Sequence, residues 1–240
     1  MKRIWLTSLI SDKETLARVT SPLAGYGLEA RGHQWQDDLE QMAWRLSREE
    51  LVDPGTSLWV ILASRAALTP PVRYGLALLA LAVKAARGTP LPLVVLGTDS
   101  QPLDPLTLPT PLRGADILDA ATPALTAKLV AKVHGASPAP GDAYRLDCYG
   151  NPHIGQWFEL GPTSPHTWNG ACFGVAGGTI AFQAVGPCGQ LPEKSTLAFP
   201  VQGLEIALRA RTFSAWGVQN ELDGESAYFV KVEGHPEALV

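Results

Sequence analysis

Cys148 and His153 lie close together in the sequence and could supply a cysteine nucleophile with its base. A catalytic thiol needs a lowered pKa, which a helix N-terminus and a nearby imidazole usually provide. The intervening Asn151 and Pro152 predict a turn, so no helix N-terminus is expected there. We therefore expect Cys148 to be a buried strand residue. A cysteine hydrolase centred on it remains an alternative that thiol alkylation would test.

Other side chains of the second half could also do chemistry. The imidazoles and thiols considered as zinc ligands are those of His153, His166, Cys172 and Cys188. Their spacing matches neither a Cys-x-x-Cys nor a His-x-x-x-His pattern, so we expect no metal site. Carboxylates on or near expected strands, the minimum for a carbohydrate enzyme, are Glu159, Glu205 and Glu221. Nothing in the sequence pairs them, and the catalytic residues stay unknown.

Composition limits the class of protein. The chain has 240 residues, of which 46% are hydrophobic and 18% charged, so it can bury a core. Its net charge of −4 gives no reason to expect a nucleic-acid partner. No apolar stretch reaches the roughly 20 residues of a membrane span, and no signal peptide is expected. The odd number of cysteines, 3, favours free thiols in a reducing compartment. We expect a cytoplasmic protein with no membrane partner.

The chain changes character near its middle. Residues 1–136 hold 14 Lys or Arg and 13 Asp or Glu, whereas residues 137–240 hold 5 and 10. The second part also contains 14 of the 23 glycines. Residues 137–142 are small and rich in proline, which is typical of a linker. The sequence therefore predicts an α/β domain over 1–136 and a β-rich domain over 143–240.

Strand and helix patterns alternate in the first domain. The runs 57–63 and 91–96 are almost purely apolar, as in strands covered on both faces of a parallel sheet. Helices are expected over 72–87, from Asp37 or Asp38 to about residue 50, and from Pro123 as a first helical residue. Ser11 and Glu14 predict a capping box that begins another helix. Further strands are expected over 3–8, 28–33 and 115–118.

Short strand patterns separated by Gly and Pro turns fill the second domain. They are 144–149, 154–160, 179–185, 204–211 and 227–232. The glycine-rich segments 170–174 and 176–178 are interpreted as tight turns, because no helix follows them as a phosphate-binding loop requires. Five or more such strands predict a β-sandwich or partial barrel.

The order of features over residues 2–134 resembles the Toll/interleukin-1 receptor (TIR) family, whose fold is a flavodoxin-like parallel sheet. Residues 4–8, followed by Ser11, resemble the opening strand and serine-containing loop of that family, and 59–64 resemble its third strand. Residues 69–76 stand where the family has the Ser-x-Trp-Cys-x-x-Glu-Leu start of a helix. Enzymatic members cleave NAD with the Glu of this motif, but here the position is Gly75, or Tyr74 in a shifted register.

This departure shapes the functional expectation. No Asp or Glu lies between Asp53 and Asp99, so the carboxylate that would stabilise an oxocarbenium charge is missing. The leading expectation is a non-catalytic signalling or recognition protein that contacts a protein partner or a second copy of itself. The alternative is an enzyme that cleaves a nucleotide N-glycosidic bond with a displaced carboxylate. Its donors would be Glu14, Asp37, Asp38 or Glu40.

The resemblance also implies a ligand site. In open α/β sheets, ligands sit beyond the carboxyl ends of the strands, where the strand order reverses. By the resemblance, this rim includes Ser8, Ser11, Ser64 and Arg65. The same serines could equally be turn and cap residues. No cofactor is required, and NAD or a related nucleotide is the ligand that the resemblance suggests.

Overall fold

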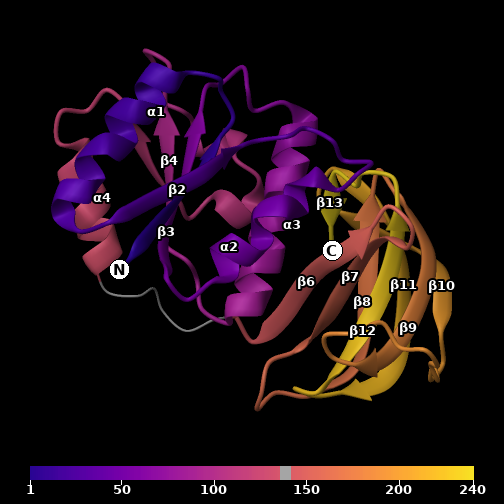
Figure 1. Ribbon diagram of the computed structural model, residues 1–240. Helices are drawn as coiled ribbons and strands as arrows, with labels where there is room; N and C mark the ends of the chain where they lie inside the picture. Colours follow the sequence, from indigo (N-terminus) through magenta and orange to yellow (C-terminus); the bar gives the residue numbers. More distant parts are fainter. Residues whose placement is uncertain (136–141) are drawn as a thin grey trace. The chain divides into compact units, whose positions relative to one another are not determined.

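The computed structural model describes residues 1–135 and 142–240. The chain divides into two compact units, Met1–Pro140 and Gly141–Val240 (Figure 1). Residues 137–141 of the expected linker lie outside the described residues. Within the described parts of the chain, no helix has the length and apolarity needed to cross a membrane.

The first unit is built on a five-stranded parallel sheet in the order β2-β1-β3-β4-β5. The strands are β1 (Arg3–Ser8), β2 (Glu29–Gln34), β3 (Thr56–Ala63), β4 (Leu93–Gly97) and β5 (Asp116–Asp119). The α-helices are α1 (Lys13–Thr20), α2 (Arg48–Val52), α3 (Pro70–Arg87) and α4 (Leu125–His134). The 3₁₀ turns are η1 (Ser21–Tyr26), η2 (Ala43–Ser47), η3 (Pro105–Thr107) and η4 (Thr110–Leu112).

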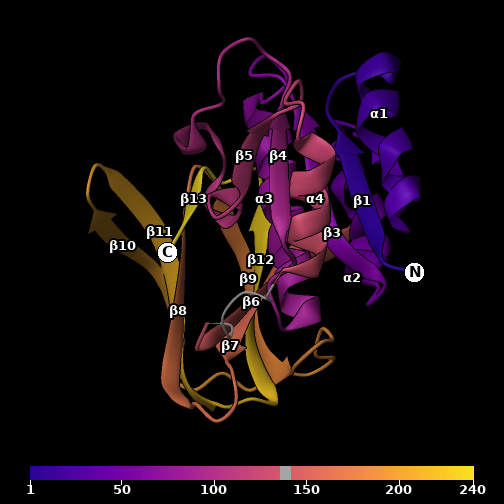
Figure 2. The same cartoon turned by 90° about the vertical axis from the view of Figure 1, so that its left-hand side faces the viewer.

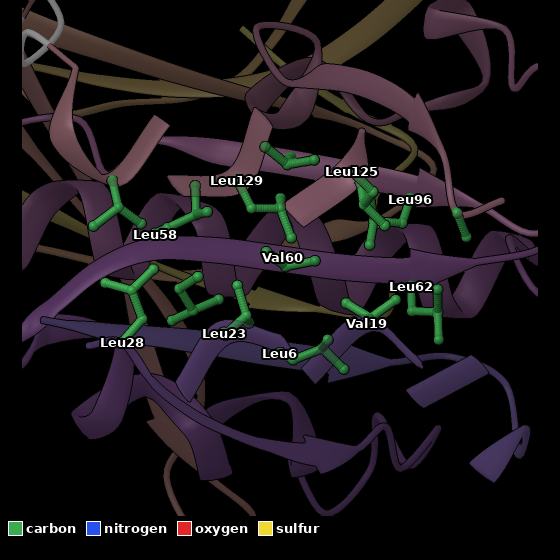
Figure 3. Packing of buried hydrophobic residues seen from close by; sticks show 14 residues of the cluster. Leu6, Val19, Leu23, Leu28, Leu58, Val60, Leu62, Leu96, Leu125 and Leu129 are labelled. Carbon is green, nitrogen blue, oxygen red and sulfur yellow. The ribbon is translucent and has the colours of Figure 1, made fainter. Parts of the chain in front are cut away.

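Helices cover both faces of this sheet. Val60 of β3 packs with Val19 of α1 and Leu129 of α4 in one apolar layer (Figure 3). Successive strand residues point to opposite faces, so Trp59 and Ile61 point to the face that α2 and α3 cover (Figure 1). Burying each such side chain stabilises the fold by about 1.5–3 kcal/mol. The two-sided burial explains the continuous apolar runs and confirms the predicted α/β class.

The predicted capping box at the start of α1 is wrong. Asp12 is the N-cap, and its Oδ1 accepts hydrogen bonds from the backbone N–H groups of Glu14 at 3.0 Å and Thr15 at 3.1 Å. Ser11 lies one residue before the cap and is exposed. A carboxylate and a serine hydroxyl can both accept hydrogen bonds from the first N–H groups of a helix. Only the carboxylate also carries a negative charge that offsets the positive end of the helix dipole.

Two other helix predictions are wrong in part. The expected helix over 39–50 is broken, because Met42 has a φ of 51°, and only η2 and the short α2 form around it. Burial of Trp44, which is 2% exposed, draws this segment onto the core. Pro123 precedes α4 instead of opening it, since Ala124 is the N-cap.

The second unit holds two four-stranded antiparallel sheets, β6-β7-β12-β9 and β10-β11-β8-β13. The strands of the first are β6 (Tyr144–Asn151), β7 (Gly155–Pro162), β9 (Thr179–Pro187) and β12 (Ser226–Glu233). Those of the second are β8 (Trp168–Ala176), β10 (Val201–Leu208), β11 (Arg211–Leu222) and β13 (Ala238–Leu239). Phe158 of β7 and Phe173 of β8 join the sheets, with ring centroids 5.2 Å apart. The predicted β-rich character is confirmed.

Strands β8 and β11 were missed, and the prediction of a turn over 170–174 is wrong. Gly170 and Gly174 lie within β8, and only Gly177 and Gly178 fall between β8 and β9. A Cβ at Gly174 would lie 2.8 Å from Val240 Cγ1, and one at Gly170 would lie 2.8 Å from a backbone oxygen. These glycines therefore allow close packing inside a strand, although their composition is typical of turns.

Candidate functional site

The carboxyl ends of β1, β3 and β4 form one rim of the parallel sheet, and hydrogen bonds join the loops that leave it. The Trp35 N–H donates to the Ser8 carbonyl at 2.8 Å, and Leu9 N–H donates to Leu62 at 2.9 Å. Thr98 N–H donates to the Ala63 carbonyl at 3.0 Å. The strand order reverses between β1 and β3, where open α/β sheets bind ligands. The residues on these loops are therefore the candidate site.

The two serines near β1 differ sharply. Ser8 is 1% exposed, and its hydroxyl donates to the Ile10 carbonyl at 2.6 Å. This bond closes the turn after β1 and uses the Ser8 hydroxyl proton, so the buried hydroxyl cannot donate to a ligand. Ser11 is exposed at the end of the same turn. Of the two, only Ser11 is free to meet a ligand or partner.

Ser64 and Arg65 are brought together with a carboxylate that the sequence analysis did not assign to the site. Ser64 Oγ accepts from the Ala67 N–H at 3.2 Å, which forms a turn. The Arg65 N–H donates to Asp99 Oδ2 at 2.5 Å, and Arg65 Nη2 donates to the Pro102 carbonyl at 3.3 Å. Asp99 follows β4 closely, and this position at the end of an apolar run is the signal that could have identified it.

The helix ends at this rim are poorly suited to phosphate. The Asp12 carboxylate occupies the first N–H groups of α1. A hydrogen bond from the Thr15 side chain, together with those from the backbone, holds the pKa of Asp12 below its ordinary value. At α3, Pro70 and Pro71 have no N–H, and Thr69 Oγ1 caps Val72 at 3.4 Å. Phosphate binding at a helix start depends on free N–H groups, so neither end offers the usual cradle.

Gly75, which the sequence analysis aligned with a catalytic Glu by resemblance, is covered by an indole. A Cβ placed on Gly75 would lie 2.8 Å from Trp35 Cζ2 and 3.4 Å from Leu39 Cδ2. Trp35 follows β2 directly and packs over α3. The sequence has no carboxylate at position 75, and the structure shows that the Trp35 indole occupies the space beside it.

An aromatic stack continues from Trp35 along the sheet. His33 lies between Trp5 and Trp35, with ring centroids 5.8 Å and 6.4 Å away. Trp5 Nε1 donates to His33 Nδ1 at 3.2 Å, so this nitrogen carries no proton. Burial lowers the pKa of His33 to about 4. A neutral imidazole held in this way supports the loop that carries Trp35.

The carboxylates of the displaced-carboxylate hypothesis are open to solvent. Glu14, Asp37, Asp38 and Glu40 are all exposed. Asp38 Oδ1 accepts from the Gln41 N–H at 2.9 Å and so forms a turn. An exposed carboxylate is well solvated, which is a poor setting for stabilising an oxocarbenium charge. None of these residues has the enclosure that the displaced-carboxylate hypothesis needs.

Cys148 lies in the core of the second unit and is 1% exposed, as expected of a strand cysteine. His153 lies in the exposed turn between β6 and β7. Among the described residues, no group of His, Cys, Asp or Glu is arranged to hold a metal ion. The three cysteines, Cys148, Cys172 and Cys188, are free thiols.

A partly buried polar cluster on the sheet of β6 and β7 was also missed. Arg145 donates to Cys188 Sγ at 2.6 Å and to the carbonyls of Gly224 at 3.1 Å and Ser226 at 3.0 Å. Glu159 is 5% exposed, and both its oxygens accept from the Gly189 N–H at 3.1 Å. Burial raises the pKa of both Glu159 and Cys188. The Arg145 guanidinium donates through both Nη atoms, although its Nε has no partner, and its acceptors lie on separate segments. This arrangement indicates a structural contact that holds the segment after β9.

Comparison with known proteins adds little. No protein-family model matches the chain, and no curated protein matches it. Among solved structures, the chain is similar to a protein of Burkholderia pseudomallei named as pilus assembly-related, at 19% identity and a TM-score of 0.35. The match covers 56% of this chain and 90% of that one. A likeness this low supports no inference about fold family or function.

Proposed function

We propose that this chain is a non-catalytic recognition or signalling protein. Its first unit is a TIR-like domain of the flavodoxin-like class, and the rim at the carboxyl ends of β1, β3 and β4 is its contact surface. Its second unit is a sandwich-like interaction domain. The strand order β2-β1-β3-β4-β5 supports the flavodoxin-like class.

The observation that carries the proposal is the packing of Trp35 over Gly75. Enzymatic members of the resembled family need a carboxylate at this position. Here the space is filled by an indole carbon 2.8 Å from where a Cβ would stand. A side chain at position 75 could reach the rim only if Trp35 moved away, and the stack with His33 opposes that movement.

The charge of the rim favours a protein partner over a nucleotide. The segments 9–12, 35–38, 64–69 and 98–103 contain one basic residue, Arg65. They contain four acidic residues, Asp12, Asp37, Asp38 and Asp99. A phosphate would meet net negative charge and helix ends whose N–H groups are capped or absent. A partner with a basic surface is the better match.

One observation favours the competing proposal of N-glycosidic cleavage. Asp99 lies beside Ser64 and Arg65 at the rim and is only partly exposed. It is the described carboxylate best placed to act as the displaced one. Against this role, its Oδ2 already accepts the Arg65 N–H at 2.5 Å.

Titration of the purified full chain with NAD, followed by calorimetry and by chromatography of the products, tests the proposal. We expect no nicotinamide release. Release that disappears in Asp99→Asn but persists in Glu49→Gln, which alters an exposed carboxylate of α2, would overturn the non-catalytic reading and establish the competing one. Binding without turnover that Ser64→Ala weakens would keep the protein non-catalytic and would make the rim a nucleotide sensor.

A further inference from the structure

Strand β10 is an exposed edge strand. It ends the sheet order β10-β11-β8-β13, and no described strand pairs with its other side (Figure 2). Every residue of β10 is exposed or half-buried, including the apolar Leu204 at 39% and Leu208 at 45%. Edge strands are usually protected by Lys, Pro, a bulge or an inward charge. β10 contains no Lys or Pro, its register shift lies before Leu204, and its one charged residue, Glu205, is exposed. This strand is therefore open to pairing with another strand.

The hairpin geometry determines which backbone groups are open. Leu208 pairs with Arg211 across a two-residue turn, in which Arg209 has a φ of 55°. In such a hairpin the flanking pair exchanges both hydrogen bonds, and bonded pairs then alternate along the ladder. Leu208 and Ile206 thus bond to β11. The N–H and C=O groups of Glu205 and Ala207 point outward from the sheet.

We propose that two copies of this chain associate by antiparallel pairing of β10 with β10, centred on Ile206. In this register, Glu205 of one copy stands opposite Ala207 of the second copy, so the outward groups of both residues become hydrogen-bonded. Ile206 faces Ile206 of the second copy at the closely spaced kind of pair. Leu204 faces Leu208 of the second copy. Apolar side chains from both copies then form one continuous strip on the same face.

The length of the apolar strip selects this register over its neighbours. Only shifts of two residues keep the apolar side chains on one face and the outward groups paired. Centring the pair on Glu205 would place two carboxylates opposite each other, which is destabilising. Centring it on Ala207 would place Glu205 opposite Arg209 of the second copy, but it would pair Leu204 with Ala210 and shorten the apolar strip. Centring it on Ile206 places Arg209 of the second copy at one diagonal to Glu205 and Glu205 of the second copy at the other, and it matches Leu204, Ile206 and Leu208 with the same apolar residues of the second copy. This self-complementarity favours a second copy over an unrelated strand.

The charges that the pairing uses are available. Glu205 and Arg209 are exposed, and neither forms an ion pair with another described residue. The register shift between Val201 and Leu204, where Gly203 has a φ of 69°, limits the pairing segment to Leu204–Leu208. A contact this short is small among protein interfaces, so we expect a dissociation constant in the micromolar range or weaker.

Sedimentation velocity of the full chain over a wide range of concentrations tests the proposal. We expect a reversible monomer–dimer equilibrium. Ile206→Lys places two like charges side by side at the dimer axis and should raise the dissociation constant roughly tenfold or more. Ala207→Pro removes only an outward N–H, which edge strands tolerate, and should have a similar effect without disturbing the hairpin. Thr212→Lys adds the same charge on β11, away from the edge, and should leave the equilibrium unchanged.

A charge exchange tests the register. Glu205→Arg should weaken the dimer, and combining it with Arg209→Glu should restore it, because the diagonal pair is re-formed with its signs reversed. Circular dichroism of each variant checks that the fold is kept. A monomer at every concentration, or a dimer that both Ile206→Lys and Ala207→Pro leave intact, would overturn the proposal.

Discussion

The indole of Trp35 lies over the backbone of Gly75 so closely that a Cβ at this position would stand 2.8 Å from Trp35 Cζ2. A residue directly after β2 and a residue in the second turn of α3 are thus fitted to each other. Glycine within a helix normally costs about 1 kcal/mol relative to alanine. Here it leaves room for an indole, and this packing determines which chemistry position 75 can support.

Gly75→Ala should destabilise the first unit by about 1–3 kcal/mol, because the added methyl overpacks the contact by more than helix propensity gains. In the Trp35→Ala background the same change should cost much less, since the ring is gone. Urea unfolding measures both. Gly114→Ala is the control, because a Cβ there meets nothing within 4 Å. Equal costs in the two backgrounds would show that Trp35 does not restrict position 75.

His33 should make stability depend on pH. Burial lowers its pKa from the ordinary value of 6.5 to about 4, so the unfolded chain binds a proton more readily than the folded one. The stabilisation is present above pH 6.5 and is lost as the pH falls towards 4. With allowance for the partly exposed ring, the loss should be roughly 1–2 kcal/mol.

His33→Gln retains an acceptor for Trp5 Nε1 but cannot titrate, so it should flatten the pH dependence of unfolding between about pH 7 and about pH 5. The comparison is His134→Gln, which changes an exposed histidine of α4 in the same unit. If His33→Gln and the unaltered chain lose stability in parallel over this range, the folded pKa of His33 is not depressed.

The hydroxyl of Thr7 should be needed as a hydrogen-bond acceptor in the core. Trp59 Nε1 donates to Thr7 Oγ1 at 2.9 Å, and the two residues are 2% and 0% exposed. Thr7→Val keeps the shape but leaves the indole N–H without an acceptor, which should cost about 1–3 kcal/mol. Thr7→Ser keeps the hydroxyl and should cost less. Urea denaturation would refute this prediction if the valine variant were the more stable of the two.

Arg145 should stabilise the segment after β9 through its hydrogen bonds. Besides Cys188, Gly224 and Ser226, its guanidinium donates to the Pro162 carbonyl. Lysine cannot serve acceptors in so many directions, so Arg145→Lys should destabilise the second unit by about 2–3 kcal/mol. Hydrogen exchange should show faster exchange of the Gly189 amide. Arg209→Lys, at an exposed turn, is the matched control and should change neither measurement.

The sequence by itself determined the class of each unit. Two-sided burial requires continuous apolar runs, so β3 and β4 could be recognised from composition alone, and α3 from its apolar length. The absence of a carboxylate between Asp53 and Asp99 could also be read directly. These features are local, because each depends on what a short segment must bury.

Only the tertiary structure decided which groups meet. The hydrogen bond from Arg65 to Asp99 joins residues 34 positions apart, and Trp35 reaches Gly75 across the sheet. Strand β8 could not be predicted from its sequence, because its glycines are typical of turns. Gly174 is needed there because Val240, which is distant in the sequence, packs against it. Contacts of this kind depend on strand order and register, and these follow from the packing of the whole unit. The rim serines could be named from sequence, but whether a hydroxyl was free could be seen only in the fold.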